Sequence, residues 1–276
     1  MTYATLMVHL ELGRTNTGVL QIARELTQRF KCSVIGIAAA QPMQIIGDGS
    51  GYGDGEIYQF DQDEIDHEIT AAEAEFRSAL EPEGAFLQWR SMVTPLPLAH
   101  LVAAEARGAD LIVTAASAEA DLPSARRVNT GDLVMRAGRP VLVFPAGANT
   151  IALDRMVIGW KDAREPRRAV ADALPLLQQA NHVVIAGIAK EDDLPMLRRQ
   201  LDDVSAWLKR HGIKAEPQAM LSDGDDARLL ADVAHDEDAG VVVAGAYGHS
   251  RMLEWTFGGV TRDLLLRPGR CSCLSH

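Results

Sequence analysis

Cysteine, aromatic residues and surplus positive charge are all scarce in this chain of 276 residues. The three cysteines, Cys32, Cys271 and Cys273, are too few for a disulfide framework, and we expect them to be small apolar packing residues in a reducing compartment. Lys and Arg number 27 against 38 Asp and Glu, which gives a net charge of −11. This balance argues against nucleic acid or an anionic membrane as a partner.

Long apolar runs and familiar catalytic signatures are also missing. No stretch approaches the roughly 18 apolar residues that span a bilayer, and the start lacks a basic segment followed by an apolar one, so we expect a cytoplasmic protein. The histidines, cysteines and carboxylates show no zinc-site spacing. A Walker A loop, a Gly-x-Gly-x-x-Gly fingerprint and a Gly-x-Ser-x-Gly nucleophile elbow are absent as well. The sequence therefore predicts no metal site and no catalytic residues.

What the chain does contain is an internal repeat. Segment 6–10 resembles 156–160, 34–37 resembles 185–188, 110–113 resembles 240–243, and 138–141 resembles 269–272. In the second copy we expect strands near 156–160, 182–189, 214–221, 240–245 and 270–274, and helices near 164–179, 193–211, 225–237 and 259–267. Strands that alternate with helices indicate a parallel sheet covered by helices on both faces.

The first copy is longer than the second by about twenty residues, and we assign the excess to the glycine-rich segment 47–55, which is typical of neither helix nor strand interior.

The most informative stretch begins with the apolar run 241–244. It ends in Gly245 and Gly248, and after nine further residues Gly258 opens an apolar helical segment that includes Thr261. Glycine permits close backbone approach, and a helix N-terminus offers unpaired N–H groups to an anion. In a doubly wound sheet a ligand binds at the carboxyl ends of the strands, which is where this loop begins. The pattern predicts a phosphate-binding loop.

Gly, two residues, Gly, nine residues and Gly resembles the signature of the universal stress protein family, and the whole chain resembles a tandem member with domains at residues 1–147 and 151–276. The resemblance implies an α/β fold of two doubly wound five-stranded parallel-sheet domains, of the adenine nucleotide alpha hydrolase-like type. It also implies an internal pseudo-dimer, in which the strand near 140–143 meets the strand near 270–274. The implied ligand is ATP, with Mg²⁺ as its companion ion.

The resemblance places nucleotide contacts in the second copy. Lys161 departs from the family pattern, which has an acidic residue after the first strand, and it either reaches phosphate or marks a different ligand; Asp162, one position on, is a substitute. Gly259 stands where a hydroxyl residue is usual. Substituting Val for Gly245 or Gly248 is expected to abolish binding and leave the fold intact. The implied site residues are Gly159, Trp160, Lys161, Asp162, Ile188, Ala244, Gly245, Gly248, His249, Gly258, Gly259, Val260 and Thr261.

The first copy lacks these glycines: its aligned stretch is 113–118, with Arg127 near the place of Gly258. We expect it not to bind nucleotide in the same manner, and we interpret Glu11, at its acidic position, as a solvated surface charge.

Three functional hypotheses follow. The first is a stress-response protein whose second copy binds ATP or another adenine nucleotide and acts through regulated contacts or very slow hydrolysis. The second is a scaffold that binds no nucleotide, which Lys161 and Gly259 favour. The third is a nucleotide-hydrolysing enzyme, for which no base or metal-binding carboxylate pair is recognisable. The sequence leaves open whether two chains form a homodimer.

Overall fold

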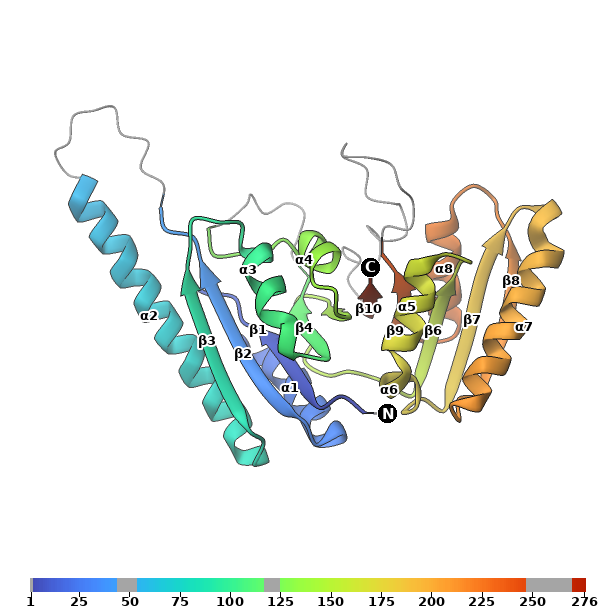
Figure 1. Cartoon of the computed structure of the whole chain (residues 1–276), viewed down its shortest axis with the longest axis horizontal. Helices are drawn as coiled ribbons and strands as arrows, with labels where there is room; N and C mark the ends of the chain where they lie inside the picture. Colours follow the sequence, from blue (N-terminus) through green and yellow to red (C-terminus); the bar gives the residue numbers. More distant parts are fainter. Residues whose placement is uncertain (1, 44–53, 117–124, 247–269) are drawn as a thin grey trace.

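The computed structural model describes residues 2–43, 54–116, 125–246 and 270–276 (Figure 1). These residues form one sheet in the order β3-β2-β1-β4-β5-β10-β9-β6-β7-β8. Its strands are β1 (Thr5–His9), β2 (Ser33–Ala40), β3 (Leu87–Val93), β4 (Leu111–Ala115), β5 (Val141–Phe144), β6 (Arg155–Trp160), β7 (His182–Ala189), β8 (Ala215–Leu221), β9 (Val241–Gly245) and β10 (Cys271–Ser275).

Helices cover both faces of this sheet. They are α1 (Thr17–Phe30), α2 (Asp54–Leu80), α3 (Leu98–Glu105), α4 (Thr130–Arg136), α5 (Arg164–Asp172), α6 (Leu174–Leu177), α7 (Leu194–Arg210) and α8 (Asp226–Asp236). Figure 1 shows α2 and α7 at the two outer flanks of the molecule. None of the described helices is long and apolar enough to cross a membrane.

Each half of the sheet is doubly wound. The first half runs β3-β2-β1-β4-β5 and the second half repeats that order in reverse, with every pair inside a half parallel. Between the halves, β5 pairs antiparallel with β10, so that Leu142 lies opposite Cys273. The predicted fold class and the internal pairing of the two copies are confirmed. The domain boundaries at residues 147 and 151 stay a prediction.

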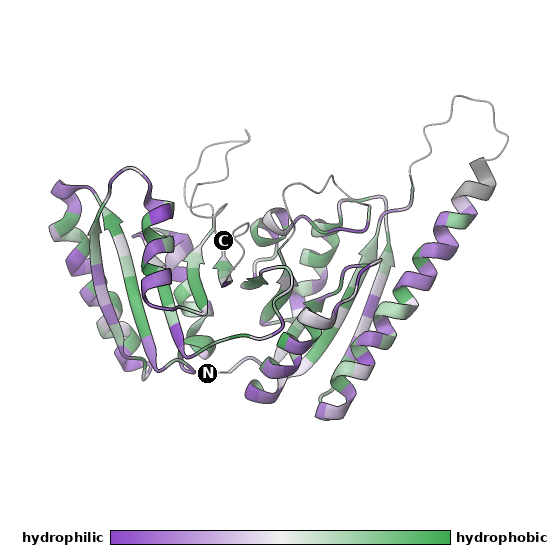
Figure 2. Ribbon diagram, turned by 180° about the vertical axis from the view of Figure 1, so that it is seen from behind, coloured by the Kyte–Doolittle hydropathy of each residue, from purple (hydrophilic) through white to green (hydrophobic). Residues whose placement is uncertain are grey.

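Alternation along the strands divides the core between the two faces. On β1, Leu6 and Val8 point to the face covered by α1, α2, α5, α6 and α7, whereas Met7 points to the face of α3 and α4. The first of these cores continues across both halves without interruption. Figure 2 shows hydrophobic residues along the central strands and hydrophilic ones on the outward sides of the helices.

All three cysteines are buried with free thiols. Cys271 and Cys273 lie in the same core, as the predicted strand alternation requires. Burial raises the pKa of both thiols to about 12, so they remain protonated packing groups at neutral pH. The interpretation of these residues as small apolar packing residues is confirmed.

Two details differ from the sequence prediction. The excess length of the first copy is not confined to the glycine-rich segment: α2 has 27 residues against 17 in α7, and it already includes Asp54 and Gly55. The predicted helix 164–179 is divided into α5 and α6 at Ala173, because Pro175 at the start of α6 has no N–H with which to continue the helical hydrogen bonds. The predicted helix 259–267 lies outside the described residues.

The segment between the halves packs tightly on the second half, and this packing can be tested at Gly240. A methyl group at Gly240 would lie 2.1 Å from the carbonyl oxygen of Ala152. We therefore expect Gly240→Ala to lower the free energy of unfolding by about 2–3 kcal/mol, measured by urea denaturation. Gly108→Ala is the control, since a Cβ there meets nothing within 4 Å, and it is expected to change stability by less than about 0.5 kcal/mol. Equal effects of the two substitutions would contradict this account.

Candidate functional site

The strand order reverses between β6 and β9 in the second half, and the predicted site residues gather at the carboxyl ends of these strands. Gly159 is in register with Ala244, and Trp160 is in register with Gly187 on β7. Ile188 follows at the end of β7, half-buried. The structure thus brings together the predicted residues 159–162, 188, 244 and 245. Gly248, His249, Gly258, Gly259, Val260 and Thr261 lie outside the described residues.

Gly245 is held close to another part of the chain itself. A Cβ on Gly245 would lie 2.4 Å from the backbone nitrogen of Pro166 and 2.6 Å from the carbonyl carbon of Glu165, both in the first turn of α5. The prediction that Gly245→Val leaves the fold intact is therefore wrong, because a larger side chain would push α5 off the sheet. Gly245 is required for packing whether or not a ligand binds beside it.

Charged residues of both signs lie where β6 passes into α5. Lys161, Arg164 and Arg167 lie within seven residues together with Asp162 and Glu165, and Arg164, whose side chain is 75% exposed, pairs with Glu165 at 3.1 Å. Arg167 donates from Nε to Asp162 Oδ1 at 3.1 Å, and Gln200 Nε2 donates to Asp162 Oδ2 at 3.3 Å. Both carboxylate oxygens of Asp162 are thus engaged within the chain, so its proposed role as a nucleoside contact would require it to exchange partners.

Trp160 packs rather than projects. It is 8% exposed and belongs to the core on the α5 and α7 face. Its indole Nε1 is buried and has no hydrogen-bond partner among the described residues. A stacking role for this ring would therefore need the core around it to open.

The equivalent position in the first half is filled. Where the second half has Gly159 and Ala244, the first has His9 and Thr114, which are both buried, with Nδ1 of His9 3.0 Å from the Thr114 hydroxyl. Burial lowers the pKa of His9 to about 4, so this imidazole is neutral at pH 7. In the second half Leu230 of α8 packs against Gly159 instead, with its Cδ2 2.9 Å from where a Cβ of Gly159 would be, so an apolar contact stands where the first half has a bonded polar pair.

An ion cluster also lies at the strand ends of the first half, and no local sequence pattern predicts it. Arg126 donates from Nε to Glu68 Oε2 at 2.6 Å and from its terminal nitrogen to Asp61 Oδ1 at 3.0 Å, both on α2. Asp61 also accepts from the N–H of Met43 at 2.7 Å. Burial works to raise the pKa of Asp61, but its bonds to Met43 and Arg126 outweigh burial and lower the pKa below its ordinary value.

This cluster lies over the loop that follows β1. Glu68 Oε1 is 2.8 Å from where a Cβ of Gly13 would be. On the same loop Glu11 forms an ion pair with Arg14 at 3.7 Å, and its side chain is only 16% exposed. The interpretation of Glu11 as a solvated surface charge is therefore wrong. Intramolecular ion pairs span the strand ends of the first half.

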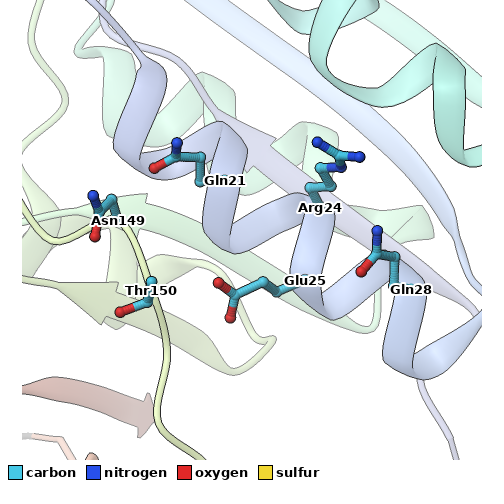
Figure 3. A pocket seen from close by; sticks show the side chains of 6 residues that line it. All are labelled: Gln21, Arg24, Glu25, Gln28, Asn149 and Thr150. Atoms are coloured by element: carbon cyan, nitrogen blue, oxygen red, sulfur yellow. The ribbon is translucent and has the colours of Figure 1, made fainter.

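A separate hollow of about 350 Å³ lies between α1 and the segment that joins the halves (Figure 3). The N–H of Ile151 donates to Glu25 Oε2 at 3.3 Å beside it. The hollow is open, and it involves none of the residues at the ends of β6 and β9. Its lining residues are Gln21, Arg24, Glu25, Gln28, Asn149 and Thr150.

Comparison with solved structures gives full-length matches. A universal stress protein from Archaeoglobus fulgidus DSM 4304 superposes with a TM-score of 0.75 at 11% identity, over 98% of this chain and 95% of that one. A putative universal stress protein from Pseudomonas aeruginosa UCBPP-PA14 gives 0.66 at 14% identity, over 99% and 93%. Two doubly wound halves joined edge to edge define the class. Within that class, this chain has the fold of the universal stress proteins.

Sequence comparisons reach less far. No family model matches the chain. Among curated proteins, cryptochrome DASH from Natronomonas pharaonis is 34% identical over 97 residues, which cover 33% of this chain. The match spans a fifth of that protein's length. The agreement with the family predicted from the glycine pattern therefore rests on the fold.

The buried His9 predicts a specific loss of stability in acid. Its pKa in the folded state is about 4, below the ordinary value of 6.5, so its stabilising contribution is complete above pH 6.5 and is lost as the pH falls toward 4. Between pH 7 and pH 5 this contribution amounts to about 2 kcal/mol of unfolding free energy.

Urea denaturation of the native chain and of His9→Gln at both pH values isolates this contribution. The amide can still bond Thr114 but does not titrate, so we expect the variant to lose about 2 kcal/mol less than the native chain. His235→Gln, in the last turn of α8, is the control and should leave the native pH dependence in place. An identical pH dependence in all three proteins would show that His9 is not responsible.

Proposed function

We propose that this protein is a nucleotide-responsive universal stress protein, in which the second half binds ATP or a related adenine nucleotide and the first half is structural. Occupancy of the site would alter contacts with partner proteins, with hydrolysis very slow or absent. The observation that supports this most directly is the contrast between the two halves at equivalent strand ends.

The topology and the exposed cations both favour an anion in the second half. Gly159 and Ala244 lie at the ends of β6 and β9, where a doubly wound sheet accepts ligands, and Leu230 of α8 packs against Gly159. Lys161 lies at that edge, and Arg164, which pairs with Glu165 at 3.1 Å, presents an exposed guanidinium there. A polyphosphate is matched by cations and by the backbone N–H groups of a glycine loop. Such side chains would hold the phosphates of ATP, with Mg²⁺ entering as part of the nucleotide.

The first half presents the opposite arrangement. Glu11 follows β1, and Asp61 and Glu68 extend from α2 toward the same region, where Arg126 already neutralises these two. An anionic ligand would have to break these ion pairs and would then face their carboxylates. This supports a division of roles, with one nucleotide site per chain.

One observation favours the scaffold hypothesis instead. Because Gly245 is needed for the packing of α5, the beginning of the glycine pattern has an architectural reason that does not involve a ligand. The two functions differ in a simple measurement, since a scaffold without nucleotide would be insensitive to ATP.

Thermal unfolding with MgATP tests the proposal. At a nucleotide concentration ten times the Kd, binding contributes about 1.4 kcal/mol, which for a chain of this size raises Tm by roughly 3 °C. We expect this shift with MgATP but not with magnesium chloride alone. The absence of a shift at millimolar MgATP would contradict the proposal and favour the scaffold.

Lys161→Asp tests the location of the site. If Lys161 faces phosphate, reversing its charge should weaken ATP binding by about tenfold, measured by calorimetry. The matched control is Lys209→Asp, in the last turn of α7 at the opposite end of the strands, which changes the net charge equally and should leave the Kd within about twofold. Equal weakening by both substitutions would indicate an effect of net charge alone. Tighter binding of the Lys161 variant would contradict the phosphate contact.

A further inference from the structure

Among the described residues the sheet has two edges without a neighbouring strand, β3 and β8, since β5 and β10 pair with each other (Figure 1). A free edge offers unpaired N–H and C=O groups to any strand that can lie beside it, and proteins commonly block such edges with proline or charge. The two edges of this sheet differ in that respect.

The β8 edge is blocked. The N–H of Ser222 donates to Ala189 on β7, so by alternation the backbone groups of Pro217 and Ala219 point away from the sheet. Pro217 thus removes an outward N–H without costing a bond to β7. The neighbouring Glu216, whose side chain is 76% exposed, adds charge.

The β3 edge has neither device. It is seven residues long, pairs with β2 along its whole length and contains no proline. Its one charged residue, Arg90, is drawn onto α3, with NH1 2.7 Å from Glu105 Oε2 and 2.9 Å from the carbonyl oxygen of Glu105. Large apolar side chains flank this strand: Phe86 is 75% exposed and Met92 is 45% exposed. Nothing along β3 discourages another strand.

The outward backbone groups of β3 follow from its bonds to β2. Phe86 C=O accepts from Val34, and Thr94 N–H donates to Ala40, so even-numbered residues face β2. Leu87, Trp89, Ser91 and Val93 therefore direct their N–H and C=O groups outward.

We infer that a second copy of this chain pairs its β3 antiparallel with this β3, in a two-fold symmetric contact centred on Trp89. In that register Phe86 of one copy lies opposite Met92 of the other, and Gln88 lies opposite Arg90. Both are non-hydrogen-bonded pairs, whose side chains approach closely. The strand is complementary to itself in its apolar residues, since the two exposed ones meet, whereas Gln88 and Arg90 already bond to each other within one copy, with Arg90 NH2 donating to Gln88 Oε1 at 3.0 Å.

Neighbouring registers lack this match. Centring the contact on Arg90 places Phe86 opposite Thr94 and Met92 opposite Gln88, which separates the two exposed apolar residues. A two-fold contact uses the same patch on both copies and leaves no free β3 edge, so association stops at two chains. The inference rests on the edge of the first half and does not depend on nucleotide binding.

Sedimentation equilibrium across a range of protein concentrations tests the dimer. The native chain should form a monomer–dimer equilibrium, and added salt should strengthen it because each copy carries −11 charges. Ser91→Pro removes an outward N–H of β3, as Pro217 does on β8. It should raise the dissociation constant of the dimer at least tenfold. Ala219→Pro, its counterpart on β8, should leave association unchanged. Circular dichroism confirms that both variants are folded.

Crosslinking tests the register. A chain with both Phe86→Cys and Met92→Cys should form disulfide-linked dimers under mild oxidation, since each introduced thiol faces its counterpart in the other copy, whereas the native thiols are buried. Either substitution alone should give little crosslinking, because identical positions lie far apart in this register. A native chain that stays monomeric, a dimer insensitive to Ser91→Pro, or equal crosslinking by a single variant would each overturn the inference.

Discussion

The antiparallel pairing of β5 with β10 is the contact on which the rest of the structure depends. Each residue of both strands is buried, so neither strand could remain a solvent-exposed edge. The join continues one hydrophobic core across both halves. A hydrogen bond across the join reinforces it: the Tyr3 hydroxyl donates to the carbonyl oxygen of Asp172 at 2.8 Å, and within the second half Ser275 of β10 donates to the Asp172 carboxylate at 2.9 Å. Separating the halves would expose this core, so we expect them to unfold together.

Within this frame the two halves have diverged at equivalent places. Both reverse their strand order between the first and fourth strand, so both had the same opportunity for a crevice. In the first half His9, Thr114 and the Arg126 cluster occupy that place with side chains. In the second half the equivalent positions are Gly159 and Ala244, and Leu230 packs against Gly159. The ion pairs of Arg164 with Glu165 and of Arg167 with Asp162 follow β6. The same topology thus supports one stabilising centre and one candidate binding site, and side chains rather than strand order decide which is which.

The sequence predicted the strands well because a buried parallel strand has a strong local signature. The predicted range 182–189 coincides with β7, and the range 214–221 differs from β8 by one residue. The long α2 was misjudged because Gly55 looks like a turn residue, yet a glycine in the first turn of a 27-residue helix costs little. The local sequence pattern predicted which segments form helices and strands. It failed to predict where α2 begins and that Pro175 divides the predicted helix 164–179 into α5 and α6.

The site was predicted less completely, because tertiary contacts define it. The residues at the ends of β6 and β9 could be found from the repeat and the glycine pattern. The packing of Gly245 against Pro166 could not, since the two are 79 positions apart and no local pattern links them. Arg126 is likewise 58 positions from Glu68. A glycine in a sequence signals close approach of the backbone, but only the fold identifies what approaches.

The joined sheet also determines which surfaces remain for association. Two separate five-stranded sheets would have four edges, and the β5–β10 join removes the two central ones. Each remaining edge belongs to a different half, so a substitution can change one edge without changing the other.

Pro217 lies at an outward-facing position of β8, where its missing N–H costs no hydrogen bond to β7. A proline at such a position protects an edge without weakening the sheet. β3 contains no proline, although a proline in place of the exposed Ser91 would likewise cost no hydrogen bond to β2. Protection of one edge alone limits strand pairing to a single surface, and a single self-complementary surface gives a closed pair instead of an open filament.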